Sequence, residues 1–538
     1  MAAESYDALI VGAGFGGIYQ LYSLLKLGLN VRLIDRCVDV GGVWQWNRYP
    51  GAMSDTHSTV YRYSWDKEDL MTYPFTDNYL YRDEIVAYLS HIVERHNLRK
   101  QMEFNLEVTS AEFNEGDGTW TVYAGGKSIK ARYLITALGH FTQVNWPSIP
   151  GQDAYKGELY HTARFPEHYD FKGKRVGVVG NGSTGVQVIV DIAQDVGSLI
   201  SFQRTPQYSV PAGRRPVTAE ERAMINREWD EIWKQVQSTT TACEFVEPKI
   251  SAMGVSTEER DRIYQEAWDL GNNLRFLRGT FNDLVSNRAS NITACEFIRK
   301  KIAETVKDPV KREKLTPTDI WNRRPICDAG YFEQFNRDNV DVVMVKDNPI
   351  VKLTQTGLEL ADGTRYDLDV IIFATGFDAI DGSYRQIKFT GRNGITLDQH
   401  WKDGPTSYFG VGVSDFPNLF MVSGPQSIIS NIPPALESYV EFITGLIATA
   451  EKRRNQGGDI KKIIVEAESQ AERDWNELCV RLGKGSLYMT SKSSFISGTN
   501  VEGKKGSTIF FMGGYKSLRE RLSTCIQEDY KGFRIAED

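Results

Sequence analysis

The fold is decided by the glycine-rich stretch Gly12-Ala13-Gly14-Phe15-Gly16-Gly17 and by its counterpart Gly180-Asn181-Gly182-Ser183-Thr184-Gly185. Each stretch follows a short apolar run, Asp7 to Val11 in one case and Val176 to Val179 in the other, and each opens a helical pattern. A strand, a Gly-x-Gly-x-x-Gly turn and a helix in this order are typical of dinucleotide binding. The glycines permit the tight turn, the approach of a pyrophosphate and close helix–strand packing, and the helix N-terminus adds positive potential. The chain is therefore predicted to bind two dinucleotides.

The residue that ends the next predicted strand differs between the two units. The run Val31 to Ile34 ends in Asp35, whose carboxylate can accept hydrogen bonds from ribose hydroxyls, as FAD or NAD requires. The run Leu199 to Phe202 is followed by Gln203-Arg204-Thr205, where the cation suits the 2′-phosphate of NADP. Opposite charges at the two ribose ends favour an enzyme that uses two different nucleotides.

A chain of 538 residues is too long for one hydrophobic core. We predict an α/β fold with two Rossmann-like dinucleotide-binding domains and a helical insertion in the second. Helical periodicity runs through residues 217–315, and Thr218-x-x-Glu221 and Ser256-x-x-Glu259 have the spacing of capping boxes. The predicted segments are the first domain, first part (1–145), the second domain, first part (152–213), the helical insertion (214–325), the second domain, second part (326–384), and the first domain, second part (385–538).

Composition excludes several classes of partner. The net charge of −7 disfavours nucleic acid and membrane surfaces, and no apolar run of about 18 residues predicts a membrane span. No signal peptide is expected, because Met1 is followed almost directly by a predicted strand. The six cysteines form no Cys-x-x-Cys pair, which disfavours a redox disulfide or a zinc knuckle. We predict a cytoplasmic monomer that binds neither nucleic acid nor membrane.

Three further stretches resemble motifs of the Baeyer–Villiger monooxygenases, single-chain flavoproteins that use FAD, NADPH and O₂. The pattern G-G-x-W-x-x-x-x-Y-P-G-x-x-x-D is matched in full from Gly41 to Asp55. The pattern F-x-G-x-x-x-H-x-x-x-W-P is matched by Tyr155-x-Gly157-x-x-x-His161-x-x-x-Phe165-Pro166, with Phe165 in place of tryptophan. Arg323-Arg324-Pro325 is similar to a K-R-P segment of the family. The resemblance covers nearly the whole chain and implies that the first domain binds FAD and the second NADP(H).

The resemblance also implies roles for individual residues. Those expected around FAD are Gly12, Gly14, Gly16, Gly17, Asp35, Val43, Trp44, Gln45, Trp46, Asp55, Tyr61 and Val108. Those expected around NADP(H) are Asn181, Gly182, Ser183, Thr184, Gly185, Val186, Gln187, Arg204, Thr205, Arg323 and Arg324. Arg324 and Asp55 would be the catalytic pair. His161 would lie between the domains and have a conformational role.

The implied chemistry explains why an arginine is needed. NADPH reduces FAD, O₂ adds at the flavin C4a, and the resulting peroxide must stay anionic to attack a ketone carbonyl. A guanidinium, which keeps its proton, can stabilise that anion and the following intermediate, while Asp55 holds Arg324 in position. The expected product is an ester or lactone, with sulfoxidation as a side activity.

Two departures leave alternatives open. Phe165 replaces a tryptophan that distinguishes this family from the N- and S-oxygenating flavin monooxygenases, so heteroatom oxygenation is the first alternative. Phe495 stands where many members have tryptophan near the nicotinamide ribose, so the coupling of NADPH use to oxygenation can differ. An NADPH oxidase or reductase and a non-catalytic redox sensor are the remaining alternatives. The sequence names no particular ketone.

Overall fold

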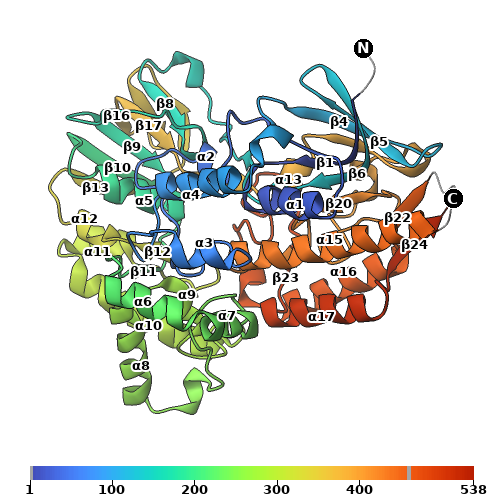
Figure 1. Ribbon diagram of the computed structural model, residues 1–538. Coiled ribbons are helices and arrows are strands. Elements are labelled where there is room, and N and C mark those ends of the chain that lie inside the picture. Colours follow the sequence, from blue (N-terminus) through green and yellow to red (C-terminus); the bar gives the residue numbers. More distant parts are fainter. Residues whose placement is uncertain (1–3, 457–461, 538) are drawn as a thin grey trace.

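The computed structural model describes residues 4–456 and 462–537. Two sheets lie side by side, with a group of helices below each (Figure 1). The first sheet has eight strands in the order β19-β4-β5-β6-β1-β2-β3, and β20 also pairs with β6. Its strands are β1 (Glu4–Val11), β2 (Val31–Ile34), β3 (Met102–Glu103), β4 (Val108–Asn114), β5 (Thr119–Ala124), β6 (Lys127–Thr136), β19 (Lys388–Thr390) and β20 (Leu419–Met421). Strand β20 runs parallel to β6, with Phe420 opposite Ile135, so two segments far apart in the chain share one sheet.

The second sheet has five strands, all parallel, in the order β13-β10-β9-β17-β8. They are β8 (Glu158–His161), β9 (Arg175–Val179), β10 (Ser198–Gln203), β13 (Val340–Met344) and β17 (Val370–Phe373). A small antiparallel sheet follows β13 in the chain and consists of β14 (Ile350–Leu353), β15 (Gly357–Leu360) and β16 (Arg365–Asp367). The prediction of an α/β fold with two parallel Rossmann-like cores is confirmed.

Each glycine turn connects a strand to the helix that was expected after it. Helix α1 (Phe15–Lys26) follows β1, and α5 (Ser183–Ile192) follows β9. A Cβ on Gly17 would lie 1.8 Å from the carbonyl oxygen of Gly12, and one on Gly185 would lie 2.1 Å from that of Gly180. The third glycine of each motif is therefore required by the contact between turn and helix.

Helices of the predicted insertion lie below the second sheet (Figure 1). They are α6 (Ala219–Arg227), α7 (Trp229–Ser238), α8 (Thr257–Leu270), α9 (Asn273–Arg278), α10 (Arg288–Thr305) and α11 (Pro309–Leu315). Thr218 and Ser256 cap α6 and α8 by accepting hydrogen bonds from the third backbone N–H of each helix. The two glutamates of these motifs also pair with arginines, Glu221 with Arg215 and Glu259 with Arg262. Arg215 and the backbone N–H of Thr218 lower the pKa of Glu221. The predicted N-caps are confirmed.

The C-terminal helices α15 (Ile432–Gln456), α16 (Ser469–Lys484) and α17 (Tyr515–Gln527) lie below the first sheet (Figure 1). Helix α15 packs against α1, where Gln20 Nε2 donates to Thr444 Oγ1 at 3.0 Å. The apolar stretch 439–450 lies within α15, so its interpretation as a packed helix is confirmed. None of the helices in the described ranges is long and apolar enough to cross a membrane. Cytoplasmic location, monomeric state and domain boundaries stay predictions.

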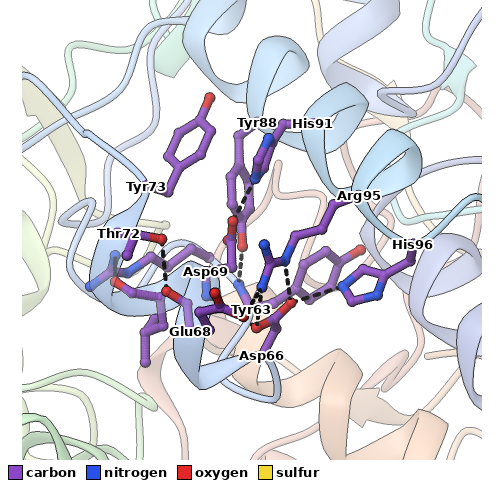
Figure 2. Close-up of polar contacts among 12 residues, drawn as sticks. Tyr63, Asp66, Glu68, Asp69, Thr72, Tyr73, Tyr88, His91, Arg95 and His96 are labelled. Carbon is purple, nitrogen blue, oxygen red and sulfur yellow. Dashed lines mark hydrogen bonds and ion pairs between the residues drawn. The ribbon is translucent and has the colours of Figure 1, made fainter.

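The first unit also contains α2 (Val43–Trp46), α3 (Lys67–Thr72) and α4 (Arg82–Arg95). A charged cluster fastens α3 to α4 (Figure 2). Asp66 accepts hydrogen bonds from Arg95 Nε at 2.7 Å, and His96 Nε2 lies 2.9 Å from the same carboxylate oxygen. The other oxygen of Asp66 caps α3 by accepting a bond from the N–H of Asp69. The first residue of α4, Arg82, donates to the carbonyl of Trp44, so this scaffold also holds α2.

Candidate active site

One cavity of about 1660 Å³ joins the two glycine turns. Its wall includes Gly12 and Gly14 from the first turn, and Gly180 and Gly182 from the second. Among the predicted site residues, those that line it are Gly12, Gly14, Gly16, Asp35, Val43, Trp44, Trp46, Asp55, Tyr61, Val108, Asn181, Gly182, Ser183, Thr184, Gln187, Arg204, Thr205, Arg323 and Arg324. Residues from distant parts of the chain thus face one space.

Four predicted site residues do not line this cavity: Gly17, Gln45, Gly185 and Val186. Gly17 and Gly185 serve helix–strand packing, as the contacts above require. Gln45 faces α4, since its side-chain oxygen accepts a bond from Arg82 Nη2 at 3.2 Å. Val186 is 1% exposed in the hydrophobic core of the second unit. The motif places these positions next to the nucleotide sites, but their side chains or Cβ positions point into the protein.

The first turn fits the pyrophosphate and ribose of FAD. Gly12 has φ +114°, and a Cβ there would lie 2.3 Å from the carbonyl oxygen of Ala137, so only glycine leaves the backbone open to a ligand. Asp35 is buried, and its two oxygens accept bonds from Ala13 N at 2.6 Å and Cys37 N at 2.7 Å. Burial raises the pKa of Asp35, and these backbone bonds counteract the rise. They fix the carboxylate in the wall of the cavity, as a ribose acceptor requires.

The short helix α2 contributes to the wall of the first site. Trp44, in α2, donates from Nε1 to the hydroxyl of Tyr61 at 3.1 Å, and both side chains line the cavity. The two rings meet edge to face with centroids 5.9 Å apart. Two locked aromatic rings give a rigid apolar wall, which is suited to a flat ring system.

The second turn fits NADP. Asn181 Nδ2 donates to Gln203 Oε1 at 2.6 Å and to the Thr205 carbonyl at 3.0 Å, which ties the turn to the end of β10. Burial lowers the pKa of Arg323, the charge of Asp319 opposes this, and the charge of Arg204 adds to it. Within the described part of the chain, neither arginine forms an ion pair with an acidic side chain. Two cations at this end of the cavity match a 2′-phosphate.

Tyr49 and Gly51, which were not assigned a role from the sequence, bring the two halves of the cavity together. The hydroxyl of Tyr49 donates to Gln187 Oε1 at 2.7 Å, and Gln187 Nε2 donates to the Met53 carbonyl at 3.0 Å. Gly51 has φ +75°, and a Cβ there would lie 2.7 Å from the Gln187 carbonyl oxygen. The Y-P-G part of the first motif was the available signal. The residues of this Y-P-G part pack the loop that contains Asp55 against α5.

The predicted catalytic pair is formed. Arg324 Nη2 donates to Asp55 Oδ2, although the two residues are 269 positions apart. Arg324 Nη1 also lies 3.5 Å from Ser183 Oγ in the second turn. The Arg324 side chain keeps 38% of its surface exposed, against 19% for Asp55. The guanidinium is thus held in place while part of it still faces the open cavity.

His161 and Phe165 lie outside the cavity wall, whereas Phe495 belongs to it. His161 is fully buried, and burial followed by the nearby Arg164 lowers its pKa to about 4. Its Nδ1 accepts a bond from Ala163 N at 3.1 Å. Phe165 packs among the rings of Tyr160, Tyr169 and Phe171. A neutral buried histidine and a packed ring agree with structural roles.

Known proteins of this shape and sequence bind flavin and NADP. The model of the family described as flavin-binding monooxygenase-like matches residues 7–208. The chain is 42% identical to a cyclohexanone 1,2-monooxygenase of an Acinetobacter species, with 98% of this chain and 96% of the relative covered. It is 41% identical to a phenazine N-monooxygenase of Lysobacter antibioticus, with 99% and 97% covered. A solved cyclohexanone monooxygenase from Rhodococcus sp. Phi1 bound to NADP+ is 44% identical with a TM-score of 0.97, and both chains are fully covered. With its two nucleotide turns opening into one cavity, the chain belongs to the Baeyer–Villiger monooxygenases, flavoenzymes that use FAD and NADPH.

Proposed function

We propose that the enzyme oxygenates ketones, so that a ketone, O₂, NADPH and a proton become an ester or lactone, NADP+ and water. Bound FAD, once reduced by NADPH, supplies the activated oxygen. The observation that carries the proposal is the contact between Arg324 and Asp55 in the cavity that both glycine turns share. Membership of an enzyme family removes the alternative of a non-catalytic sensor.

Arg324 is the proposed catalytic residue, and Asp55 is a positioning residue. A guanidinium keeps its proton, so Arg324 presents a fixed positive charge to oxygen atoms that become negative during the reaction. A preorganised charge of this kind contributes about 10²–10³ in rate. Asp55 on one side and Ser183 on the other hold the guanidinium, which leaves less of it to reorganise when the charge develops.

Arg324→Ala tests the proposal. We expect a yellow protein whose flavin is still reduced by NADPH but whose ester formation from a ketone falls by about 10²–10³ or more. Gas chromatography measures the ester, and anaerobic stopped-flow absorbance measures flavin reduction. Arg323→Ala is the matched control, because its loss should raise the KM for NADPH and leave ester formation at saturating NADPH. Persistent ketone turnover in the Arg324→Ala enzyme would contradict the role of this residue.

Heteroatom oxygenation is a second candidate, favoured by the relative named phenazine N-monooxygenase. Transfer of an electrophilic oxygen to nitrogen or sulfur does not require an anion-stabilising arginine. If this were the main activity, the Arg324→Ala enzyme would oxygenate a thioether or an aromatic amine as fast as the parent enzyme. Product analysis with both a ketone and a thioether therefore separates the two candidates in one experiment.

A further inference from the structure

Helix α9 is labelled in Figure 1. It brings a further cation, Arg278, to the cavity wall that also contains Arg204, Arg323 and Arg324. Asn273, Leu274, Leu277 and Arg278 all line the cavity, as neighbours at spacings of one helical turn do. Asn273 Nδ2 donates to the carbonyl of Pro325 at 3.0 Å, which fixes the first turn of α9 beside Arg324. Five residues of helix rise by about 7.5 Å, so Arg278 lies further along the same wall.

No residue in the described part of the chain forms an ion pair with Arg278. Arg275, one turn earlier, differs: its guanidinium lies 3.6 Å from Glu244 and packs against the ring of Phe245. Four acidic residues line the cavity. Asp55 pairs with Arg324 and Glu107 with Arg36, the oxygens of Asp35 accept backbone bonds, and the exposed Glu502 forms no ion pair with Arg278. Among the described residues, no acidic side chain therefore neutralises the charge of Arg278.

The lining of the same cavity also includes Val285, Ser286, Leu482 and Ser486, none of which carries a charge. The backbone N–H of Leu487 donates to the Val285 carbonyl, which joins the insertion to the segment that follows α16. The buried Tyr488 lies within the electrostatic reach of both cations: burial raises the pKa of its hydroxyl, and Arg278 and Arg324 oppose that rise. A half-buried cation on such a wall favours a ligand that brings its own negative charge.

We propose that Arg278 binds a carboxylate of the substrate and that the preferred substrates are oxo acids, ketones that carry a carboxylate several bonds away from the carbonyl. The inference rests on the proposed ketone oxygenation and adds the chemical class of the substrate. A planar guanidinium pairs with a carboxylate through two parallel hydrogen bonds, so it fixes the orientation of the chain as well as its charge. The carbonyl then lies towards Arg324 at the other end of α9.

Substrate pairs that differ only in charge test the proposal. The probes are straight-chain methyl ketones of increasing length that end in a carboxylate, each compared with its methyl ester. We expect kcat/KM to be higher for the acid than for the ester, with an optimum at intermediate length. In Arg278→Met the acid-to-ester ratio of kcat/KM should fall about 10–100-fold, mainly through KM, and Arg278→Lys should retain part of the preference. Arg288→Met, a loss of the same charge at an exposed position of the insertion, should leave the ratio unchanged.

Binding of a non-reactive acid separates this inference from the proposed function. Heptanoate lacks a ketone, and its affinity can be measured from flavin fluorescence, with heptanamide as the uncharged control. We expect Arg278→Met to weaken heptanoate binding at least tenfold and to leave heptanamide binding as it was. Equal ratios for acid and ester in the parent enzyme, or equal losses of heptanoate and heptanamide binding, would overturn the proposal. Intact heptanoate selectivity without oxygenation of any ketone would instead contradict the proposed function alone.

Discussion

The two glycine turns have nearly the same backbone but very different surroundings. Gly12 and Gly180 have φ angles of +114° and +108°, and a Cβ on either would meet the carbonyl oxygen of an alanine, Ala137 or Ala374. The second strand of each unit then ends in a different group. Asp35 is buried with both oxygens bonded to backbone N–H groups, whereas Arg204 is exposed.

This difference shows which part of the motif determines the ligand. The repeated backbone geometry can hold any pyrophosphate, because glycine and the helix N-terminus supply the same contacts in both units. The buried acid suits a nucleotide that stays bound, and the exposed cation suits one that exchanges at each turnover. Substitutions at the two turns should therefore have different consequences, although the local geometry is alike.

The largest effect is expected for Gly12→Ala. The new Cβ would lie 2.3 Å from the Ala137 carbonyl oxygen, so the turn must shift away from the pyrophosphate position. We expect a protein that is purified without flavin and whose activity falls by at least about 100-fold. Flavin absorbance relative to protein absorbance measures the loss. Gly173→Ala is the control: φ is +71° there but no atom lies within 4 Å of the added Cβ, so flavin should be retained.

The next effect is expected at the second turn, in Gly180→Ala and Gly182→Ala. Both proteins should remain yellow. In Gly180→Ala the affinity for NADPH should fall by about 100-fold. Only Gly180→Ala should also lower the melting temperature, because its Cβ would lie 2.5 Å from the Ala374 carbonyl oxygen while nothing lies within 4 Å of a Cβ on Gly182. Loss of flavin from either variant would mean that the two turns are not independent.

A smaller and more selective effect is expected for Arg204→Glu. The KM for NADPH should rise about 10–100-fold, because a charge-assisted bond to the 2′-phosphate is replaced by repulsion. The KM for NADH should change little, since NADH lacks that phosphate. Steady-state kinetics with both nucleotides measures the preference, and Arg204→Lys should retain most of it. An equal rise for both nucleotides would remove Arg204 from the phosphate site.

The turns and their charge selectors could be predicted because each depends on a few consecutive residues. The contact of Arg324 with Asp55 could not be derived from spacing, since 269 residues separate the two; only the resemblance to a family pointed to it. The packing role expected for the third glycine of each motif is confirmed at Gly17 and Gly185. Their assignment to cofactor binding stays a prediction.

Tertiary contacts set other features that the sequence does not show. The glutamates of the two predicted capping boxes bind arginines, Arg215 and Arg262, which the spacing does not indicate. Arg278 gave no signal in the sequence because an arginine in the last turn of a short helix is ordinarily a solvated, dipole-stabilising residue. Its position on the cavity wall depends on how the insertion packs against the loop at Pro325.

The smallest effect is expected in the scaffold beside the first turn, for Asp66→Asn. Asparagine can still cap α3 but loses the charged contact with Arg95, so we expect about 0.5–1.5 kcal/mol less stability at pH 7 and unchanged flavin content. His96 adds no charge at this pH, because burial lowers its pKa. Burial raises the pKa of Asp66, but Arg95 and the cap bond outweigh it and lower the pKa below its ordinary value. The stabilisation is therefore complete above the unfolded pKa of about 3.9 and disappears as pH falls through the folded value.

Denaturant unfolding of the parent enzyme and of Asp66→Asn as a function of pH checks this direction of the pH dependence. The difference in unfolding free energy should be constant near neutral pH and shrink in acid, while Asp66→Ala should lose about a further 1 kcal/mol with the cap. A difference that grew in acid would contradict the assignment of the charge. Release of flavin from Asp66→Asn would mean that the cluster between α3 and α4 belongs to the first nucleotide site. The two units would then differ in the contacts that hold the site as well as in the residue that binds the ribose.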